Sequence, residues 1–99
     1  MMVFAKTYGG DVLASSSAGA IPGALATAAR HRDRFVMAGH IDPYDDTVFN
    51  RVQLGVLVEE FEQLGELCDA EQVEALRELI GLARVAMGKV HATLLFSGD

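Results

Sequence analysis

Residues 57–90 read LVEEFEQLGELCDAEQVEALRELIGLARVAMGKV, and this stretch decides the fold. Apolar residues recur in it at steps of three and four, the spacing of one face of an α-helix, and glutamates fill many positions between them. Asp69, with Gln72 three residues later, is typical of a capping box at the start of a second helix. Only a couple of residues separate the two helical patterns, which predicts an antiparallel helical hairpin.

Each predicted helix has an apolar face and a polar face. The first begins near Leu54 and has the buried face Leu57, Phe61, Leu64, Leu67 and Cys68. Its predicted solvent-facing residues are Glu59, Glu60, Glu62, Gln63 and Glu66. The second has the predicted buried face Val73, Leu76, Ile80, Ala83, Met87 and Val90.

The rest of the chain predicts strands and one further helix. Residues 2–8 and 12–17 alternate as two short strands around the Gly9-Gly10 turn. Residues 20–32, with Pro22 in the first turn, predict a helix whose small residues require close packing. Apolar runs at 34–41 and 94–96 predict two more strands. The order β-β-α-β-α-α-β predicts one compact α+β domain over 1–99, with the helical hairpin on one face of a small, mainly antiparallel sheet.

Charge is the most informative global property. The net charge is −6, and eleven of the fourteen acids lie between residues 42 and 78, against Arg51 and Arg77. Such a distribution opposes binding to nucleic acid or to an anionic membrane, and it favours a basic partner. The alternative is that the acids only form solvated helix faces that keep the protein soluble. The basic run at 30–34 is interpreted as a helix C-terminus, or as a partner of the chain's own acids.

The composition bounds the compartment and the chemistry. No apolar run is long enough to span a membrane, and we read no signal peptide at the N-terminus. The single cysteine, Cys68, has no internal disulfide partner, so a reducing, cytoplasmic compartment is expected. No P-loop, G-x-S-x-G or G-x-G-x-x-G motif is present, and no cofactor is expected.

The segment HIDPYDDTVFNR, residues 40–51, concentrates the polar side chains that chemistry would need. One interpretation is a metal or acid–base site formed by His40, Asp42, Asp45 and Asp46, although the spacing matches no calcium loop and no zinc motif. The other is a polar turn opened by Asp42-Pro43, in which side chains satisfy backbone N–H groups. The turn interpretation also places Val48, Phe49 and Val52 in the core.

This segment and the C-terminal LLFSGD carry a resemblance. Residues 41–53 (IDPYDDTVFNRVQ) and residues 94–99 resemble segments of short actinobacterial proteins of about this length. We associate no activity with those proteins. The resemblance therefore implies a free-standing small protein and no particular function.

The leading hypothesis is a small acidic, non-enzymatic domain that binds a basic protein partner, for example an inhibitor or immunity-type protein. Self-association through the Ala/Gly-rich helix is a variant of it. The expected partner-binding residues are Asp42, Tyr44, Asp45, Asp46, Glu59, Glu60, Glu62 and Glu66, with Tyr44 as the aromatic anchor. The alternative is a small metal-assisted hydrolase or lyase that uses the 40–46 His/Asp loop.

Overall fold

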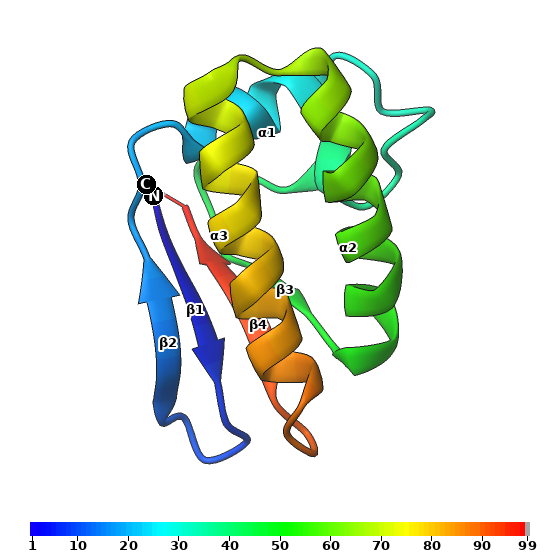
Figure 1. Cartoon of the computed structure of the whole chain (residues 1–99). Coiled ribbons are helices and arrows are strands. Elements are labelled where there is room, and N and C mark those ends of the chain that lie inside the picture. Colours follow the sequence, from blue (N-terminus) through cyan, green and yellow to red (C-terminus); the bar gives the residue numbers. More distant parts are fainter. Residues whose placement is uncertain (99) are drawn as a thin grey trace.

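The helices and strands follow one another in the predicted order. The computed structural model describes residues 1–98, and Asp99, the last residue of LLFSGD, lies outside the described residues. Within residues 1–98 the elements are β1 (Met2–Lys6), β2 (Val12–Ser16), α1 (Ile21–Ala29), η1 (Ala38–His40), β3 (Thr47–Phe49), α2 (Arg51–Leu64), η2 (Gly65–Leu67), α3 (Ala70–Met87) and β4 (Thr93–Ser97) (Figure 1). The predicted α+β class is confirmed.

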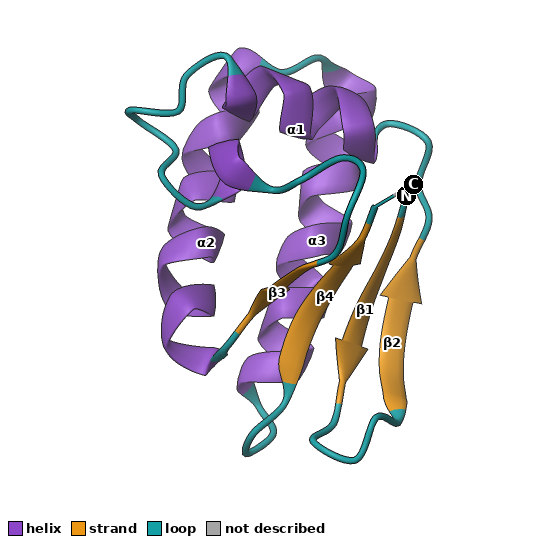
Figure 2. Cartoon of the chain, turned by 180° about the vertical axis from the view of Figure 1, so that it is seen from behind, coloured by secondary structure: helices purple, strands orange, loops and turns teal. Residues whose placement is uncertain are grey.

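The strands form an antiparallel sheet in the order β2-β1-β4-β3. Helices cover one face of this sheet and leave the other uncovered, as the view from behind shows (Figure 2). Val3 pairs with Phe96 and Phe4 pairs with Leu95 across the central strands. Successive side chains of a strand point to opposite faces of the sheet. Val3 and Phe96 are therefore fully buried on the face that the helices cover, whereas Phe4 and Leu95 are half-buried on the other face.

The predicted helical hairpin is confirmed, and both of its helices begin at a capping box. The Asp69 carboxylate accepts a hydrogen bond from the Gln72 backbone N–H at 2.8 Å, and the Gln72 side chain accepts one from the Asp69 N–H at 3.3 Å. Asn50 and Gln53 form the same pair of hydrogen bonds at the start of α2. The first helix therefore begins at Arg51 rather than near Leu54.

The buried face of α3 differs from the prediction. Leu76 and Ala83 are buried as predicted, but Ile80 and Met87 are only half-buried, and Val90 lies beyond the helix with 68 % of its surface exposed. The remaining buried residues of α3 are Ala75, Leu79, Leu82 and Ala86. This face differs because α3 contacts both the sheet and the other two helices, whereas a single 3-4 repeat describes contact with one neighbour.

The strand predicted over 34–41 is wrong. That segment forms turns and the short η1 helix, and the third strand of the sheet lies later, at Thr47–Phe49, paired with β4. Phe35, Ala38 and Ile41 of the segment are still buried, with Phe35 and Ala38 at 0 % and 1 % exposure, whereas Val36 is 57 % exposed. Their pattern signalled burial, but they are buried beneath the helices and not in the sheet.

Gly39 allows the closest approach between η1 and α1. A Cβ atom at this position would lie 3.0 Å from the Ala28 carbonyl oxygen and 3.1 Å from the Arg32 Cα, both backbone atoms. The close packing expected of the Ala-rich helix is therefore present, and Ala24 and Ala28 are fully buried.

We expect Gly39→Ala to lower the free energy of unfolding by about 1–3 kcal/mol, because the backbone must move to admit the methyl group. Gly81→Ala is the matched control. Gly81 lies inside α3 with open space around its Cα, so alanine there should raise stability by up to about 1 kcal/mol. Urea denaturation measures both, and equal effects of the two substitutions would contradict the predicted close approach.

Candidate functional site

The segment between η1 and β3 forms a hydrogen-bonded polar turn. The Asp42 carboxylate accepts a hydrogen bond from the Tyr44 N–H at 2.8 Å, and Asp45 accepts one from the Asp46 N–H at the same distance. The Thr47 hydroxyl accepts one from the Asp42 N–H at 3.1 Å. The turn interpretation is therefore confirmed for residues 42–46, because these side chains satisfy backbone donors. The rest of the 40–51 segment belongs to η1, to β3 and to the start of α2.

The predicted metal site receives no support from this geometry. His40 lies in η1 with its Nδ1 3.0 Å from the Val36 carbonyl oxygen. Within residues 1–98, no three His, Cys, Asp or Glu side chains converge in an arrangement that could hold a metal ion. His40, Asp42, Asp45 and Asp46 are all exposed, so no burial separates the carboxylates as acid–base catalysis requires.

The turn is held against the C-terminal end of β4. Gly98 lies so close to the backbone of Tyr44 and Asp45 that a Cβ atom there would overlap it. Phe49 in β3 packs edge-on against Phe96 in β4, with ring centroids 5.8 Å apart. Residues 41–53 and the described part of 94–99 are therefore neighbours in the structure.

Only one of the three apolar residues placed in the core after this turn is buried. Phe49 is 6 % exposed, as predicted, but Val48 and Val52 are 54 % and 84 % exposed, which corrects their assignment. Val48 lies on the sheet face opposite to Phe49 because β3 is a strand. Val52 lies in the first turn of α2, on its solvent side. The structure also assigns Asn50 to the cap of α2 and not to the turn.

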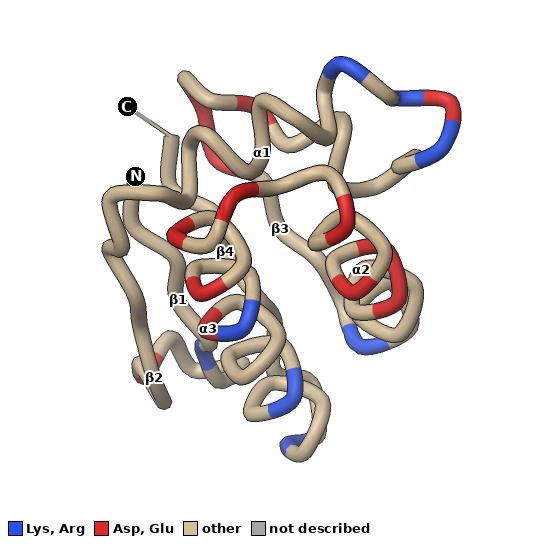
Figure 3. The backbone as a smooth tube through the Cα atoms, turned by 45° about the horizontal axis from the view of Figure 1, so that its top comes forward, with Lys and Arg blue, Asp and Glu red and all other residues tan. Residues whose placement is uncertain are grey.

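A second candidate surface covers the outer side of α2 and α3. Acidic residues follow α2, the turn after it and the first half of α3 (Figure 3). We call this surface the acidic face and define it by the exposed residues Glu59, Glu62, Glu66, Asp69, Glu71, Glu74 and Glu78. Its ion pairs join Glu66 to Arg34 at 3.7 Å and Glu62 to Arg84 at 3.8 Å, which confirms that the basic run at 30–34 contacts the chain's own acids.

The acidic face and the 42–46 turn do not form one surface. Figures 1 and 2 show the molecule from opposite sides. The helical hairpin is in front in Figure 1, whereas the chain from η1 to β3 crosses in front of the helices in Figure 2. The sequence alone predicts that the turn and the helical glutamates form one partner-binding surface, because their acids are close in the chain. Asp42, Tyr44, Asp45 and Asp46 therefore lie apart from Glu59, Glu62 and Glu66.

Glu60 is the one predicted contact residue that the structure removes from the surface. It is 7 % exposed, and its carboxylate accepts hydrogen bonds from the Met37 N–H at 3.1 Å and the Ala38 N–H at 2.9 Å. The expectation that Glu60 faces solvent is wrong. Its role is structural, because the carboxylate satisfies backbone donors that have entered the protein interior.

We expect Glu60→Ala to lower the free energy of unfolding by about 2–4 kcal/mol, because two N–H groups lose their acceptor. Glu60→Gln should cost less, since it keeps one acceptor oxygen. Glu59→Ala is the matched control on an exposed neighbour and should change stability by less than about 0.5 kcal/mol. Chemical denaturation measures all three, and a Glu60→Ala effect no larger than that of Glu59→Ala would refute the capping role.

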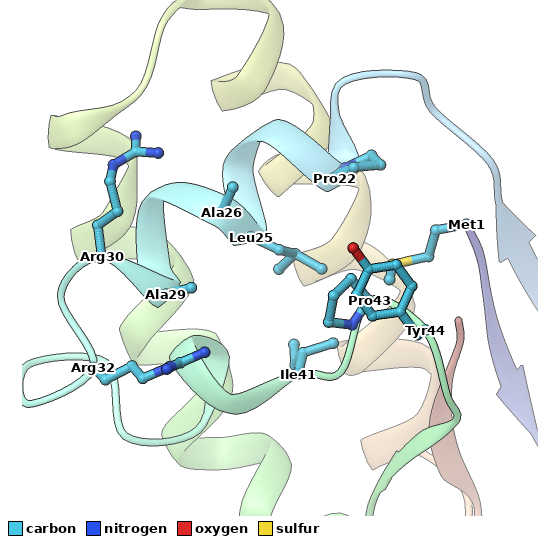
Figure 4. A pocket seen from close by; sticks show the side chains of 10 residues that line it. All are labelled: Met1, Pro22, Leu25, Ala26, Ala29, Arg30, Arg32, Ile41, Pro43 and Tyr44. Atoms are coloured by element: carbon cyan, nitrogen blue, oxygen red, sulfur yellow. The ribbon is translucent and has the colours of Figure 1, made fainter. Parts of the chain in front are cut away.

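Sequence reasoning missed a pocket beside the polar turn. It has a volume of about 490 Å³ and lies between α1, the segment around Ile41 and the chain start (Figure 4). The lining residues are Met1, Pro22, Leu25, Ala26, Ala29, Arg30, Arg32, Ile41, Pro43 and Tyr44. No periodicity marks this set, because it joins three segments that are distant in sequence.

Cys68 is half-buried next to the start of α3. Burial raises the pKa of its thiol above the ordinary value, although a hydrogen bond with Thr27 acts in the opposite direction. The thiol is therefore protonated at neutral pH and is a poor nucleophile.

We expect iodoacetamide to alkylate Cys68 more slowly in the folded protein than in urea at the same pH, and the folded rate should rise as the pH becomes alkaline. The unfolded thiol, with the lower pKa, loses its proton first. Deprotonation of Cys68 should therefore lower the free energy of unfolding as the pH rises above the pKa of the unfolded thiol. Equal alkylation rates in the folded and unfolded chain, read by mass spectrometry, would contradict the pKa shift.

No protein-family model, curated protein or solved structure matches this chain. Within residues 1–98, no helix combines the length and the apolar character needed to cross a membrane.

Proposed function

We propose that this chain is a small non-enzymatic binding domain whose acidic face binds a partner protein with a basic surface. The carrying observation is the charge of that face: it has seven exposed acids, and the arginines paired with them are Arg34, Arg77 and Arg84, so acids exceed bases by four. A surface of one sign accelerates association with the opposite sign and excludes partners of its own sign.

The ion pairs on the acidic face leave it available to a partner. Glu74 lies 3.4 Å from Arg77, and the pairs of Glu62 and Glu66 with arginines are similarly exposed. Exposed pairs of this kind contribute about 0–1 kcal/mol, so a partner's lysines and arginines can replace them at little cost. The hairpin beneath the face is rigid, because both helices are capped and their inner sides are buried.

The concrete form that we favour is an inhibitor or immunity-type protein for a basic enzyme in the cytoplasm. A binding domain of that kind needs a rigid charged face and no catalytic group. Tyr44 does not serve as its anchor, because it lies apart from the acidic face. Self-association through α1 is not favoured either, since Ala24 and Ala28 on its small-residue side are already buried.

Two charge-reversed variants test the proposal. The first carries Glu59→Lys, Glu62→Lys and Glu66→Lys, and the second carries Asp11→Lys, Asp45→Lys and Asp46→Lys, which changes the net charge equally but away from the acidic face. Each immobilised variant is exposed to extract at low and at high salt, and retained proteins are identified. We expect a basic partner on the wild type and on the second variant at low salt, and about tenfold or greater loss on the first.

Three results would overturn the proposal. Equal loss on both variants would mean that only net charge matters, and loss on the second variant alone would move the contact to the 42–46 turn. Failure of the wild type to retain any basic protein at low salt would remove the basis for a charged partner. Circular dichroism of both variants confirms that the fold is intact.

A further inference from the structure

The pocket beside α1 has an apolar floor formed by residues that the fold holds in place. Leu25 and Ile41 contribute to it and are 6 % and 7 % exposed. Its volume of about 490 Å³ is within the range of about 300–1,000 Å³ typical of sites for small organic molecules. The wall opposite α1 is the polar turn, which Gly98 fixes from behind through its contact with the Tyr44 and Asp45 backbone.

Arg32 supplies a positive charge at one end of this pocket. Figure 4 shows its side chain below Ala29 and extended toward Ile41. The Gly39 carbonyl accepts a hydrogen bond from its Nε at 2.9 Å, which orients the guanidinium. Within residues 1–98 no carboxylate forms an ion pair with Arg32, so its charge is not compensated by the chain around it.

Arg30 also borders the pocket but plays a different part. Its side chain points away from the other lining residues in Figure 4, and its Nη2 donates a hydrogen bond to the Thr27 hydroxyl at 3.1 Å. Arg30 therefore directs its charge away from the pocket interior, and the control is Arg77, which has the same charge and lies exposed on α3 outside the pocket lining.

Tyr44 and Pro43 form the other end of the pocket. The Tyr44 side chain is 81 % exposed, and Figure 4 shows its ring across from Leu25 with the hydroxyl directed toward α1. The Asp42 carboxylate accepts a hydrogen bond from the Tyr44 N–H at 2.8 Å, which orders the backbone beneath this exposed ring. Exposed aromatic rings over an apolar floor are common in small-molecule sites, because binding of a ligand buries both.

We propose that this pocket binds a small organic acid: a free molecule with an apolar body, seated on Leu25 and Ile41, and one carboxylate that pairs with Arg32. The guanidinium of Arg32 at one end matches the carboxylate, and the apolar floor along the rest of the pocket matches the apolar body. The lining comes from α1, the segments that follow it and the chain start, and it includes no residue of the edge strands β2 and β3 that could pair with an extended peptide backbone, which favours a free acid over a chain terminus. This site lies apart from the acidic face and does not depend on the proposed function.

Decanoate is the probe, titrated below its micelle concentration into ¹⁵N-labelled full-length protein and followed by amide chemical shifts. We expect saturable changes confined to the chain start, residues 21–32 and residues 39–45. Arg32→Gln should weaken binding about tenfold or more, since a hydrogen-bonded charge pair is lost, whereas Arg77→Gln should leave it within about twofold. Decanol, which lacks the charge, should bind the wild type as weakly as decanoate binds Arg32→Gln.

A second variant keeps the test decisive if Arg32→Gln disturbs η1 through its lost bond to Gly39. Ala29→Met places a longer apolar side chain at a half-exposed lining position and should reduce decanoate binding about tenfold with the charge of Arg32 intact. Shifts spread over the uncovered sheet face, equal binding by Arg32→Gln and Arg77→Gln, or no saturable change at all would each overturn the proposal. A peptide with a free carboxylate that binds more tightly than decanoate at the same residues would overturn the assignment to a free acid.

Discussion

The buried carboxylate of Glu60 is the constraint on which the functional half of the molecule depends. It enters the interior from α2 and accepts hydrogen bonds from the Met37 and Ala38 N–H groups. Without this carboxylate those N–H groups would lose their acceptor inside the protein. The Glu60 side chain therefore stabilises the path of the chain between α1 and β3. Gly39 is then held against α1, and its carbonyl orients Arg32. The position of the pocket and of the polar turn follows from this contact.

The same constraint separates two surfaces that are close in the chain. Because η1 is held beneath α2, the segment that follows it reaches β3 behind the helical layer, while the glutamates of α2 and α3 remain in front. The molecule thus has two separate surfaces: the acidic face, which we propose binds a protein, and an apolar pocket into which Arg32 extends, which we propose binds a small acid. Neither surface uses the aspartates of residues 42–46 for chemistry, since their carboxylates satisfy backbone donors in the turn.

Aromatic packing joins the sheet to the hairpin at the centre of the core. Phe96 in β4 contacts Phe49 in β3 and Phe61 in α2, with ring centroids 5.8 Å and 6.4 Å apart. The short β3 is therefore held by side-chain packing as well as by its ladder to β4. This packing also explains why Phe49 is buried, whereas its neighbours Val48 and Val52 are exposed.

Local sequence patterns predict the class of fold, the helical hairpin, the Asp69 cap and the turn opened by Asp42-Pro43, because each pattern depends on residues within a few positions of one another. No local pattern predicts that residues 34–41 form turns and η1 in place of a strand, that Glu60 is internal, or that Arg32 and Tyr44 border one pocket. Those features depend on contacts between segments far apart in the chain. A local pattern shows whether a residue is apolar or charged, but the residues that it contacts depend on the packing of the whole domain.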